Sequence, residues 1–327
     1  MSDSCAVVMV VRDEPSERLQ RAIAALAAQT DVAPFAVYVA APEGEHAALR
    51  ALGALRALGA VREIVPVVNP GGKRCAGLNA AVRAACADVV VRVDARSRVQ
   101  PDHVARCATR LAGDPSVGVV GGVQWPSPLA NDRSERATVR ALRNRWLLGN
   151  AGYRRPGASG PVDTVYLGAF RRAELLDLGG YDERLDANED FELCSRYLAA
   201  GRTVWLEPDL LVDYEPRIGA SAVFAQYRAF GEAKVAYWRA TGSRPNRRQL
   251  VALGLAASGA IALLASLRRP RRAAALVTAG LTAVAVLDHL ADPHEPDPRV
   301  RARACAASVA TTTGWLWGVL RGLLSRS

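Results

Sequence analysis

Apolar, β-branched runs alternate with helical patterns along roughly the first 125 residues of the chain. Helical spacing is clear in "SERLQRAIAALAAQ", where Leu19, Ile23 and Leu26 fall on one face. Further helices are expected over residues 45–59, 75–86 and 101–113. Strands are expected for the runs "CAVVMVV", "FAVYVAA", "VREIVPVV", "DVVVRVD" and "VGVVGGV". This alternation predicts an α/β fold, in which a mostly parallel twisted sheet is flanked by helices.

The pattern changes near the C-terminus, where long uncharged stretches begin. "QLVALGLAASGAIALLASL" has 19 residues without a charge, enough to span a bilayer as a helix. Two later stretches are shorter, and they fit either membrane spans or a helical hairpin lying in the membrane interface. We therefore expect two to three membrane-associated segments, at about 249–267, 273–291 and 304–324. The chain divides accordingly into a domain of residues 1–240 and a hydrophobic tail of residues 241–327.

Flanking charges leave the orientation of these segments open. Arginines lie on both sides of the first stretch, and each cluster favours a cytoplasmic position. The start of the chain, "MSDSCAVVMVVRDEP", contains acidic Asp3 and no basic region, so it does not look like a signal peptide. The N-terminal domain is therefore expected at the cell membrane, facing the cytoplasm.

Charge and metal-ligating residues narrow the function classes. The net charge is +10, and of the 42 basic residues only Lys73 and Lys234 are lysines. No basic-aromatic alternation suited to stacking bases appears, so nucleic acid is not expected as a partner. A basic balance with a hydrophobic tail fits an anionic membrane surface or phosphorylated substrates. The six cysteines and four histidines are scattered without a CxxC pair, which argues against a zinc site.

A carboxylate follows a buried strand in "VVVRVDARS". In open parallel sheets ligands bind at the carboxyl ends of the strands, so Asp94 should lie there together with Arg12 and the loop at Gly71 and Gly72. Asp94 fits a plain helix cap, or a ligand that holds Mg²⁺ or Mn²⁺ against a nucleotide diphosphate. Arg96 can meet phosphate oxygens directly through its planar fork.

A second group of carboxylates stands at the start of an amphipathic helix, in "NEDFELCSRYL". Carboxylates in a first turn are often plain caps, because they interact favourably with the helix dipole. The functional alternative is that Asp190 is a general base, held within reach of an acceptor hydroxyl. A third motif, "NPGGKRC", carries Lys73 and Arg74 before a helix and could cradle phosphate, although it lacks P-loop spacing.

Taken in order, these pieces resemble a known family. "VVRDE", "NPGGKRCAGLN", "VVVRVDARS", "GPVDTVYLGAFRRAELLDLGGYDERLDANEDFELCSRYLAAG" and "YEPRIGASAVFAQYRAFGEAK" follow one another between residues 5 and 240. The set is similar to a GT-A glycosyltransferase of family 2, and within it to the membrane-associated branch of succinoglycan-biosynthesis glucosyltransferases. The hydrophobic tail has a similar placement in that branch.

The resemblance implies a role for several residues. Asp190 would be the catalytic base, and Glu189 would orient the acceptor or the metal shell. Asp94 would be the first carboxylate of a DxD-type element that holds the divalent cation and the donor diphosphate. The remaining implied positions are Arg12, Glu14 and Asn79 near the nucleotide, Gly168 beside the donor sugar, and Gln226 on a helix next to the active site at the membrane.

Three departures from the family pattern matter. The second strand ends in Ala40-Ala41-Pro42 instead of an acidic stretch that reads the base and ribose. The DxD-type element reads Asp94-Ala95-Arg96, so its second carboxylate is missing and Arg96 is expected to share in neutralising the donor diphosphate. "AFG" replaces the Arg-Trp pair of processive synthases, which favours the addition of one sugar per encounter.

The resemblance implies an inverting glycosyltransferase that moves a sugar from a nucleotide-diphospho-sugar to a lipid-linked or polysaccharide acceptor in cell-surface glycan synthesis. One competing interpretation is a polyprenyl-phosphate glycosyl synthase, whose lipid phosphate would bind the basic stretch 136–155. Arg154 in that stretch is expected on the acceptor and membrane side, although a solvated helix face explains the same arginines. A degenerate membrane scaffold without catalysis also fits the departures. A nucleotidyltransferase would want a Gly-rich basic N-terminal signature, which "RDEPSERLQR" lacks.

Overall fold

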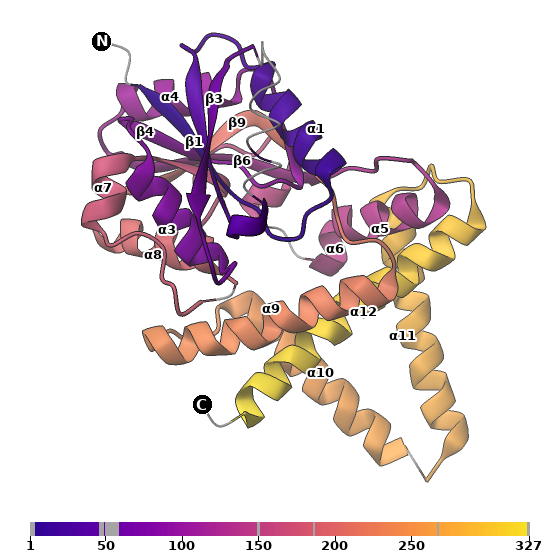
Figure 1. The fold of residues 1–327 in the computed structure, drawn as a ribbon. Helices are drawn as coiled ribbons and strands as arrows, with labels where there is room; N and C mark the ends of the chain where they lie inside the picture. The colour runs from indigo at the N-terminus through magenta and orange to yellow at the C-terminus, as the bar shows by residue number, and fades with distance from the viewer. Residues whose placement is uncertain are drawn as a thin grey trace. The chain divides into compact units, whose positions relative to one another are not determined.

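The computed structural model describes residues 4–45, 49, 59–148, 151–185, 187–266 and 268–325. The chain forms two compact units that do not follow chain order. The sheet unit consists of Met1–Trp125 and Ala151–Tyr214, and the helical unit consists of Pro126–Asn150 and Glu215–Ser327. Each unit is drawn in Figure 1, where the colour follows the residue number.

A single mixed sheet organises the first unit. The described strands form a 9-stranded sheet in the order β3-β2-β1-β4-β8-β6-β9-β5, with β7 paired to β9. β1, β2, β3 and β4 pair in parallel, as the sequence predicts, and β8 then joins β4 and β6 antiparallel. β5 and β7 pair antiparallel with β9. The strands are β1 Cys5–Val10, β2 Phe35–Ala41, β3 Val61–Val68, β4 Val89–Arg92, β5 Ser97–Val99, β6 Val117–Pro126, β7 Gly160–Pro161, β8 Tyr166–Arg171 and β9 Thr203–Tyr214.

Helices cover both faces of this sheet. Side chains alternate along each strand, so Val7 and Met9 enter one core cluster while Ala6 and Val8 enter the other. The first cluster is closed by α1 (Ser16–Ala27) and α4 (His103–Gly113), and the second by α3 (Arg74–Ala84), α7 (Arg172–Asp177) and α8 (Glu189–Ala199). This arrangement confirms the α/β class. Most of the helix expected over 45–59 lies outside the described residues.

The helical unit is built on the packing of two long helices. It contains α5 (Arg133–Arg143), α6 (Arg145–Leu148), α9 (Ala220–Thr241), α10 (Arg247–Ser266), α11 (Pro270–Ala291) and α12 (Pro298–Leu324). Along α12, Gly314, Gly318 and Gly322 recur every four residues and face α9. A Cβ on Gly314 would lie 2.6 Å from the carbonyl oxygen of Phe224, and one on Gly318 would collide with that of Arg228. The two backbones therefore approach at a seam that only glycine permits.

Two helices of this unit are long and apolar enough to cross a membrane. Among the described residues these are Gln249–Ser266 and Pro270–Ala291, with mean hydropathy of 1.8 and 1.7. They coincide with the first two segments that the sequence predicts. The third expected segment, 304–324, falls within α12, whose buried face packs against α9 and α5.

A buried ion pair fixes one end of α11 to α5. Arg140 donates from Nε to Asp288 Oδ1 at 2.8 Å and from Nη2 to Asp288 Oδ2 at 2.9 Å. Its Nη1 also donates to Asp292 Oδ2 at 2.7 Å. Since a buried charge is tolerated only with partners of this kind, Arg140 has a structural role within the helical unit.

Candidate active site at the carboxyl edge of the sheet

Two segments far apart in sequence meet where the parallel strands end. β4 ends at Arg92, two residues before Asp94, and α8 begins at Glu189. Arg92 Nη2 donates to Glu189 Oε1 at 3.0 Å, across 97 residues of sequence. The carboxyl edge of the sheet therefore carries the carboxylates that the sequence singles out, as expected for an open α/β sheet.

Arg92 is the centre of this group. Its Nε donates to Asp94 Oδ1 at 3.0 Å and its Nη2 to Asp94 Oδ2 at 3.2 Å, so both carboxylate oxygens are engaged. The side chain of Arg92 is only 6% exposed, and that of Glu189 only 4%. The guanidinium carbon also lies 5.9 Å from the ring centroid of Tyr181. A buried arginine requires such partners, because an unpaired charge is costly to remove from water.

The charges of this network hold each other ionised. Burial by itself lowers the pKa of Arg92, but Asp94 and Glu189 outweigh it and hold that pKa well above its ordinary value. Burial likewise raises the pKa of Asp94, while Arg92 and Arg74 lower it further than burial raises it. Asp94 is therefore ionised at neutral pH and forms an ion pair with Arg92.

Arg74 is the solvent-accessible cation of the group. Its Nη1 lies 3.4 Å from Glu189 Oε1, and its side chain is 55% exposed. It stands at the first position of α3, next to the loop that the sequence predicts as a phosphate cradle. Because this guanidinium is exposed, it can bind an anionic ligand without a prior conformational change.

Glu189 and Asp190 are neighbours with opposite pKa shifts. Burial raises the pKa of Glu189, but Arg92 and Arg74 lower it below its ordinary value. Burial and the charge of Glu189 raise the pKa of Asp190. A carboxylate whose pKa is raised binds a proton more readily, so an arrangement of this kind can combine one permanent charge with one proton acceptor.

The backbone before this pair is strained. Asn188 caps α8 in the left-handed conformation, at a φ of 64°, and its side-chain Nδ2 is buried without a hydrogen-bond partner among the described residues. Asp190 Oδ1 accepts from the N–H of Phe191 at 2.7 Å. Leu167 at the start of β8 and Asp13 after β1 have φ values of 53°, again unusual for side chains other than glycine. Strain of this kind concentrates at functional sites.

Arg12 and the glycine loop lie against each other. A Cβ on Gly72 would collide with Arg12 Cδ, and Gly72 has a φ of +57°. Arg12 Nε is 3.9 Å from Asp13 Oδ2, and the Arg12 side chain is 60% exposed. Lys73, also exposed, follows Gly72 directly. Three accessible cations therefore lie together, namely Arg12, Lys73 and Arg74, and they are named here the loop cations.

Arg96 and Glu14 pair with each other. Arg96 Nε lies 3.4 Å from Glu14 Oε1, and Arg18 Nη1 donates to Glu14 Oε2 at 2.5 Å. Arg98, which also follows Asp94, pairs with Asp213 at 3.4 Å. The guanidinium that meets Asp94 is therefore that of Arg92, inside the strand, and not one of the two that follow it.

Asn79 and Gly168 have packing contacts that account for their identity. Asn79 Oδ1 accepts from the N–H of Tyr181 at 2.8 Å, and its Nδ2 donates to the Tyr181 carbonyl at 2.8 Å and to Glu183 Oε1 at 2.9 Å. A Cβ on Gly168 would lie 2.6 Å from the Phe170 ring. The donor contacts that the resemblance implies for both residues stay predictions.

The two residues expected on the acceptor side lie in different units. Arg154 belongs to the short helix Gly152–Arg154 of the sheet unit, where its guanidinium carbon lies 5.4 Å from the ring centroid of Tyr153. Gln226 lies on α9 of the helical unit. The expected roles of both stay predictions.

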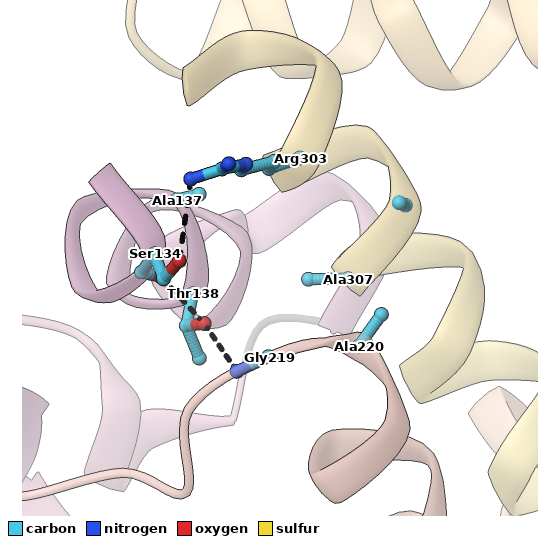
Figure 2. A pocket seen from close by; sticks show the side chains of 8 residues that line it. Ser134, Ala137, Thr138, Gly219, Ala220, Arg303 and Ala307 are labelled. Atoms are coloured by element: carbon cyan, nitrogen blue, oxygen red, sulfur yellow. Dashed lines mark hydrogen bonds between the residues drawn. The ribbon is translucent and has the colours of Figure 1, made fainter. Parts of the chain in front are cut away.

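A pocket of about 300 Å³ lies in the helical unit, between α5, the start of α9 and α12 (Figure 2). Half of the residues that line it are alanines, and its polar groups pair with each other. Arg303 Nη1 donates to Ser134 Oγ at 3.3 Å, and the N–H of Gly219 donates to Thr138 Oγ1 at 3.1 Å, as Figure 2 shows. The residues that line it include none of the site residues predicted from the sequence.

The carboxylates of the site do not fit a divalent cation. Within the described ranges, no group of three or more His, Cys, Asp or Glu residues is arranged to hold a metal ion. Both oxygens of Asp94 accept hydrogen bonds from Arg92, and Oε1 of Glu189 is shared by Arg92 and Arg74. Arg96 stands where the resemblance places the second carboxylate. Mg²⁺ and Mn²⁺ prefer several uncompensated oxygen ligands, which this set does not offer.

Sequence reasoning missed Arg92. Arg92 lies in the valine run "VVVRVD", which predicts a buried strand and no function for the arginine within it. The signal was present, because a charged residue at a buried strand position must find a charged partner. The identity of that partner, Glu189, could not be read from the sequence, because it arrives from a helix 97 residues later.

Comparison with solved structures identifies the fold. The chain is similar to the mannosyltransferase PcManGT from Pyrobaculum calidifontis, solved in complex with GDP-Man and Mn²⁺. The match covers 99% of this chain and 88% of that one, with a TM-score of 0.54 and 17% sequence identity. GalNAc-T7, solved with UDP, GalNAc and Mn²⁺, matches 72% of this chain and 50% of its own length, with a TM-score of 0.49 and 14% identity, too distant to add to the assignment. No family model and no curated protein matches the sequence. The chain has the GT-A fold that its sequence predicts, and likeness at this identity speaks for the fold alone.

Proposed function

We propose that this chain is a membrane-associated, inverting glycosyltransferase that moves a sugar from a nucleotide-diphospho-sugar to a lipid-linked or polysaccharide acceptor. The observation that carries the proposal is the pair at the start of α8. Asp190, with a raised pKa, adjoins a Glu189 held ionised by Arg92 and Arg74. The GT-A fold, shared with a mannosyltransferase solved with GDP-Man, supports a nucleotide-sugar donor.

The proposed chemistry is a single displacement. The acceptor hydroxyl oxygen forms a bond to the anomeric carbon while the bond from that carbon to the diphosphate oxygen breaks. The electron pair leaves with the nucleoside diphosphate, and the hydroxyl proton passes to Asp190. The loop cations Arg12, Lys73 and Arg74 stabilise the charge that develops on the departing diphosphate. Glu189 acts by keeping Arg92 and Arg74 in place and by raising the pKa of its neighbour.

The fold neighbour and the residues of this chain differ in what they indicate about a divalent cation. The Mn²⁺ solved with PcManGT supports the expectation of Mg²⁺ or Mn²⁺ for this fold. The carboxylates of this chain do not fit such an ion, since Arg92 engages both oxygens of Asp94. No step of the proposed chemistry therefore depends on a divalent metal ion.

The finer assignment rests on the sequence. Membership of family 2, likeness to the succinoglycan branch and a hexosyl donor are proposed from the ordered motifs. Attachment to the cell membrane is supported by α10 and α11, and we propose that the catalytic domain, residues 1–240, faces the cytoplasm. Two of the arginines proposed to bind a lipid phosphate in the alternative synthase already have carboxylate partners, because Arg136 pairs with Glu295 and Arg140 with Asp288. A hydroxyl acceptor, which needs a base, is therefore favoured over a phosphate acceptor.

The test is release of nucleoside diphosphate by the full chain in detergent, across a panel of UDP-, GDP- and TDP-sugars. The proposal predicts turnover of one donor, with Asp190→Asn inactive and Asp177→Asn, an exposed aspartate outside the site, unchanged. Turnover that persists in Asp190→Asn would instead favour the synthase that uses a lipid phosphate. Failure to bind any of the nucleotides would favour a scaffold without catalysis.

A further inference from the structure

Resting on the proposed function, we infer that sugar transfer in this chain requires no divalent cation. Arg92 occupies both oxygens of Asp94, and the loop cations Arg12, Lys73 and Arg74 take over the neutralisation of the donor diphosphate. Asp94 is then a positioning residue that holds a buried guanidinium, and not a metal ligand.

Arg92 stands in the way of a metal ion at Asp94. A cation bound to this carboxylate would approach its oxygens to roughly 2.0–2.6 Å. The Nε and Nη2 atoms of Arg92 already lie 3.0 and 3.2 Å from the same two oxygens. Binding would place a metal ion a few ångströms from the positive charge of Arg92, at a carboxylate whose side chain is 24% exposed, or would expel a guanidinium that is only 6% exposed. Either event opposes metal binding.

Among the described residues, no cluster of carboxylates arranged to hold a metal ion replaces Asp94. Oε1 of Glu189 already accepts from Arg92 at 3.0 Å and from Arg74 at 3.4 Å. Position 96, where a second acidic ligand would be required, is an arginine that pairs with Glu14. The two ionised carboxylates of the centre, Asp94 and Glu189, are thus matched by two guanidinium groups, Arg92 and Arg74.

Accessible positive charge is present beside the site. Arg12 and Arg74 have side chains 60% and 55% exposed, and Lys73 lies between Gly72 and Arg74. Gly72 lets the loop turn with a φ of +57° while Arg12 packs on it. Arginine forks bind phosphate oxygens in pairs and stay charged at any physiological pH. Three cations can therefore meet a diphosphate where a metal ion would otherwise be needed.

The experiment measures binding of UDP, GDP and TDP to the full chain in detergent by calorimetry, once in EDTA and once in Mn²⁺. In parallel, Mn²⁺ alone is titrated and followed by electron paramagnetic resonance. We expect one nucleotide to bind with the same Kd, within about twofold, in both conditions, and no tight Mn²⁺ site without nucleotide. A Kd that tightens tenfold or more with Mn²⁺ would overturn the inference while leaving the proposed function standing. Binding of no nucleotide in either condition would remove the proposed function itself, and the inference with it.

A variant pair locates the charge responsible. Arg74→Gln should weaken nucleotide binding in EDTA by about tenfold or more, since it removes a charged hydrogen-bond donor. Arg62→Gln is the matched control. The side chain of Arg62 is 61% exposed and ion-paired, much like that of Arg74, but Arg62 lies at the start of β3, the end away from the glycine loop. If Arg74→Gln and Arg62→Gln bind nucleotide as the wild type does, the loop cations do not replace a metal and the inference is wrong.

Discussion

Arg92 donates two hydrogen bonds to Asp94, two residues further along the chain, with Nε to Oδ1 at 3.0 Å and Nη2 to Oδ2 at 3.2 Å. The same guanidinium reaches Glu189 on α8, so one buried arginine joins the end of β4 to the start of the helix that carries Asp190. This link places the proposed base at the edge of the sheet and, at the same time, engages both oxygens of the carboxylate that would otherwise be free for a metal ion.

Replacing Arg92 should both destabilise the protein and open a metal site. Arg92→Gln leaves Asp94 and Glu189 as buried carboxylates without their main partner, and breaking such a network costs about 3–5 kcal/mol. Thermal unfolding in detergent measures this loss. The freed oxygens should also bind Mn²⁺ in a spin-resonance titration in which the wild type does not, and Arg92→Lys, which keeps the charge, is the control. A folded Arg92→Gln protein with no gain in Mn²⁺ binding would contradict this account of Asp94.

The pH dependence of activity should report Asp190. A base works only when ionised, and burial and Glu189 raise the pKa of Asp190. As the pH decreases, activity should therefore be lost at a higher pH than the value of about 4 at which an ordinary aspartate becomes protonated. The measurement is kcat/KM for nucleoside diphosphate release against pH.

Removal of the neighbouring charge should shift that profile. Glu189→Gln should move the acidic limb to lower pH, because a neutral side chain no longer raises the pKa of Asp190. Glu17→Gln makes the same change in the first turn of α1, away from the site, and should leave the limb where it is. An acidic limb that does not move in Glu189→Gln would exclude Asp190 as its source.

Asn79 should affect stability more than nucleotide binding. Its amide holds both the N–H and the carbonyl of Tyr181, so Asn79→Ala leaves buried polar groups unpaired and should cost about 2–4 kcal/mol. Thermal unfolding and nucleotide calorimetry on the same sample separate the two effects. Weaker nucleotide binding at unchanged stability would instead favour the donor contact that the family resemblance implies.

The glycine seam of the helical unit should tolerate no added methyl group. Gly318→Ala places a Cβ against the carbonyl oxygen of Arg228 and forces α9 and α12 apart, which should cost about 1–3 kcal/mol. Gly254→Ala in α10 is the matched control, because none of the described residues outside the helix backbone would lie within 4 Å of its Cβ. The control should be neutral or slightly stabilising, because alanine favours helix more than glycine does. Equal unfolding temperatures for the two variants would contradict the close approach of α9 and α12.

The fold was predictable where periodicity is strong. The valine-rich runs placed β1, β2, β3 and β4 correctly, and the uncharged stretches placed α10 and α11, because burial on both faces and a lipid environment both leave long apolar segments. The antiparallel half of the sheet was not expected. Its strands β8, β6 and β9 pair across distant parts of the chain, and local patterns do not encode such pairing.

The candidate site was predictable in position but not in its contacts. Asp94 and Asp190 follow from a strand end and a helix start, both of which are local features. The pairing of Arg92 with Glu189 and of Arg96 with Glu14 depends on how the strands and helices meet. The seam of Gly314, Gly318 and Gly322 depends on how closely α9 approaches α12, which the spacing of glycines along one helix does not specify.

The most direct test of the central claim compares the wild type with Asp190→Asn for release of nucleoside diphosphate from the best donor, measured in EDTA. If Asp190 is the base and no metal is needed, the wild type turns over in EDTA, and the variant is slower by about 10²–10⁴-fold while it binds the nucleotide equally well. Equal rates for the two proteins would contradict the role of Asp190, and a wild type that is active only after Mn²⁺ is restored would contradict the role given to the arginines.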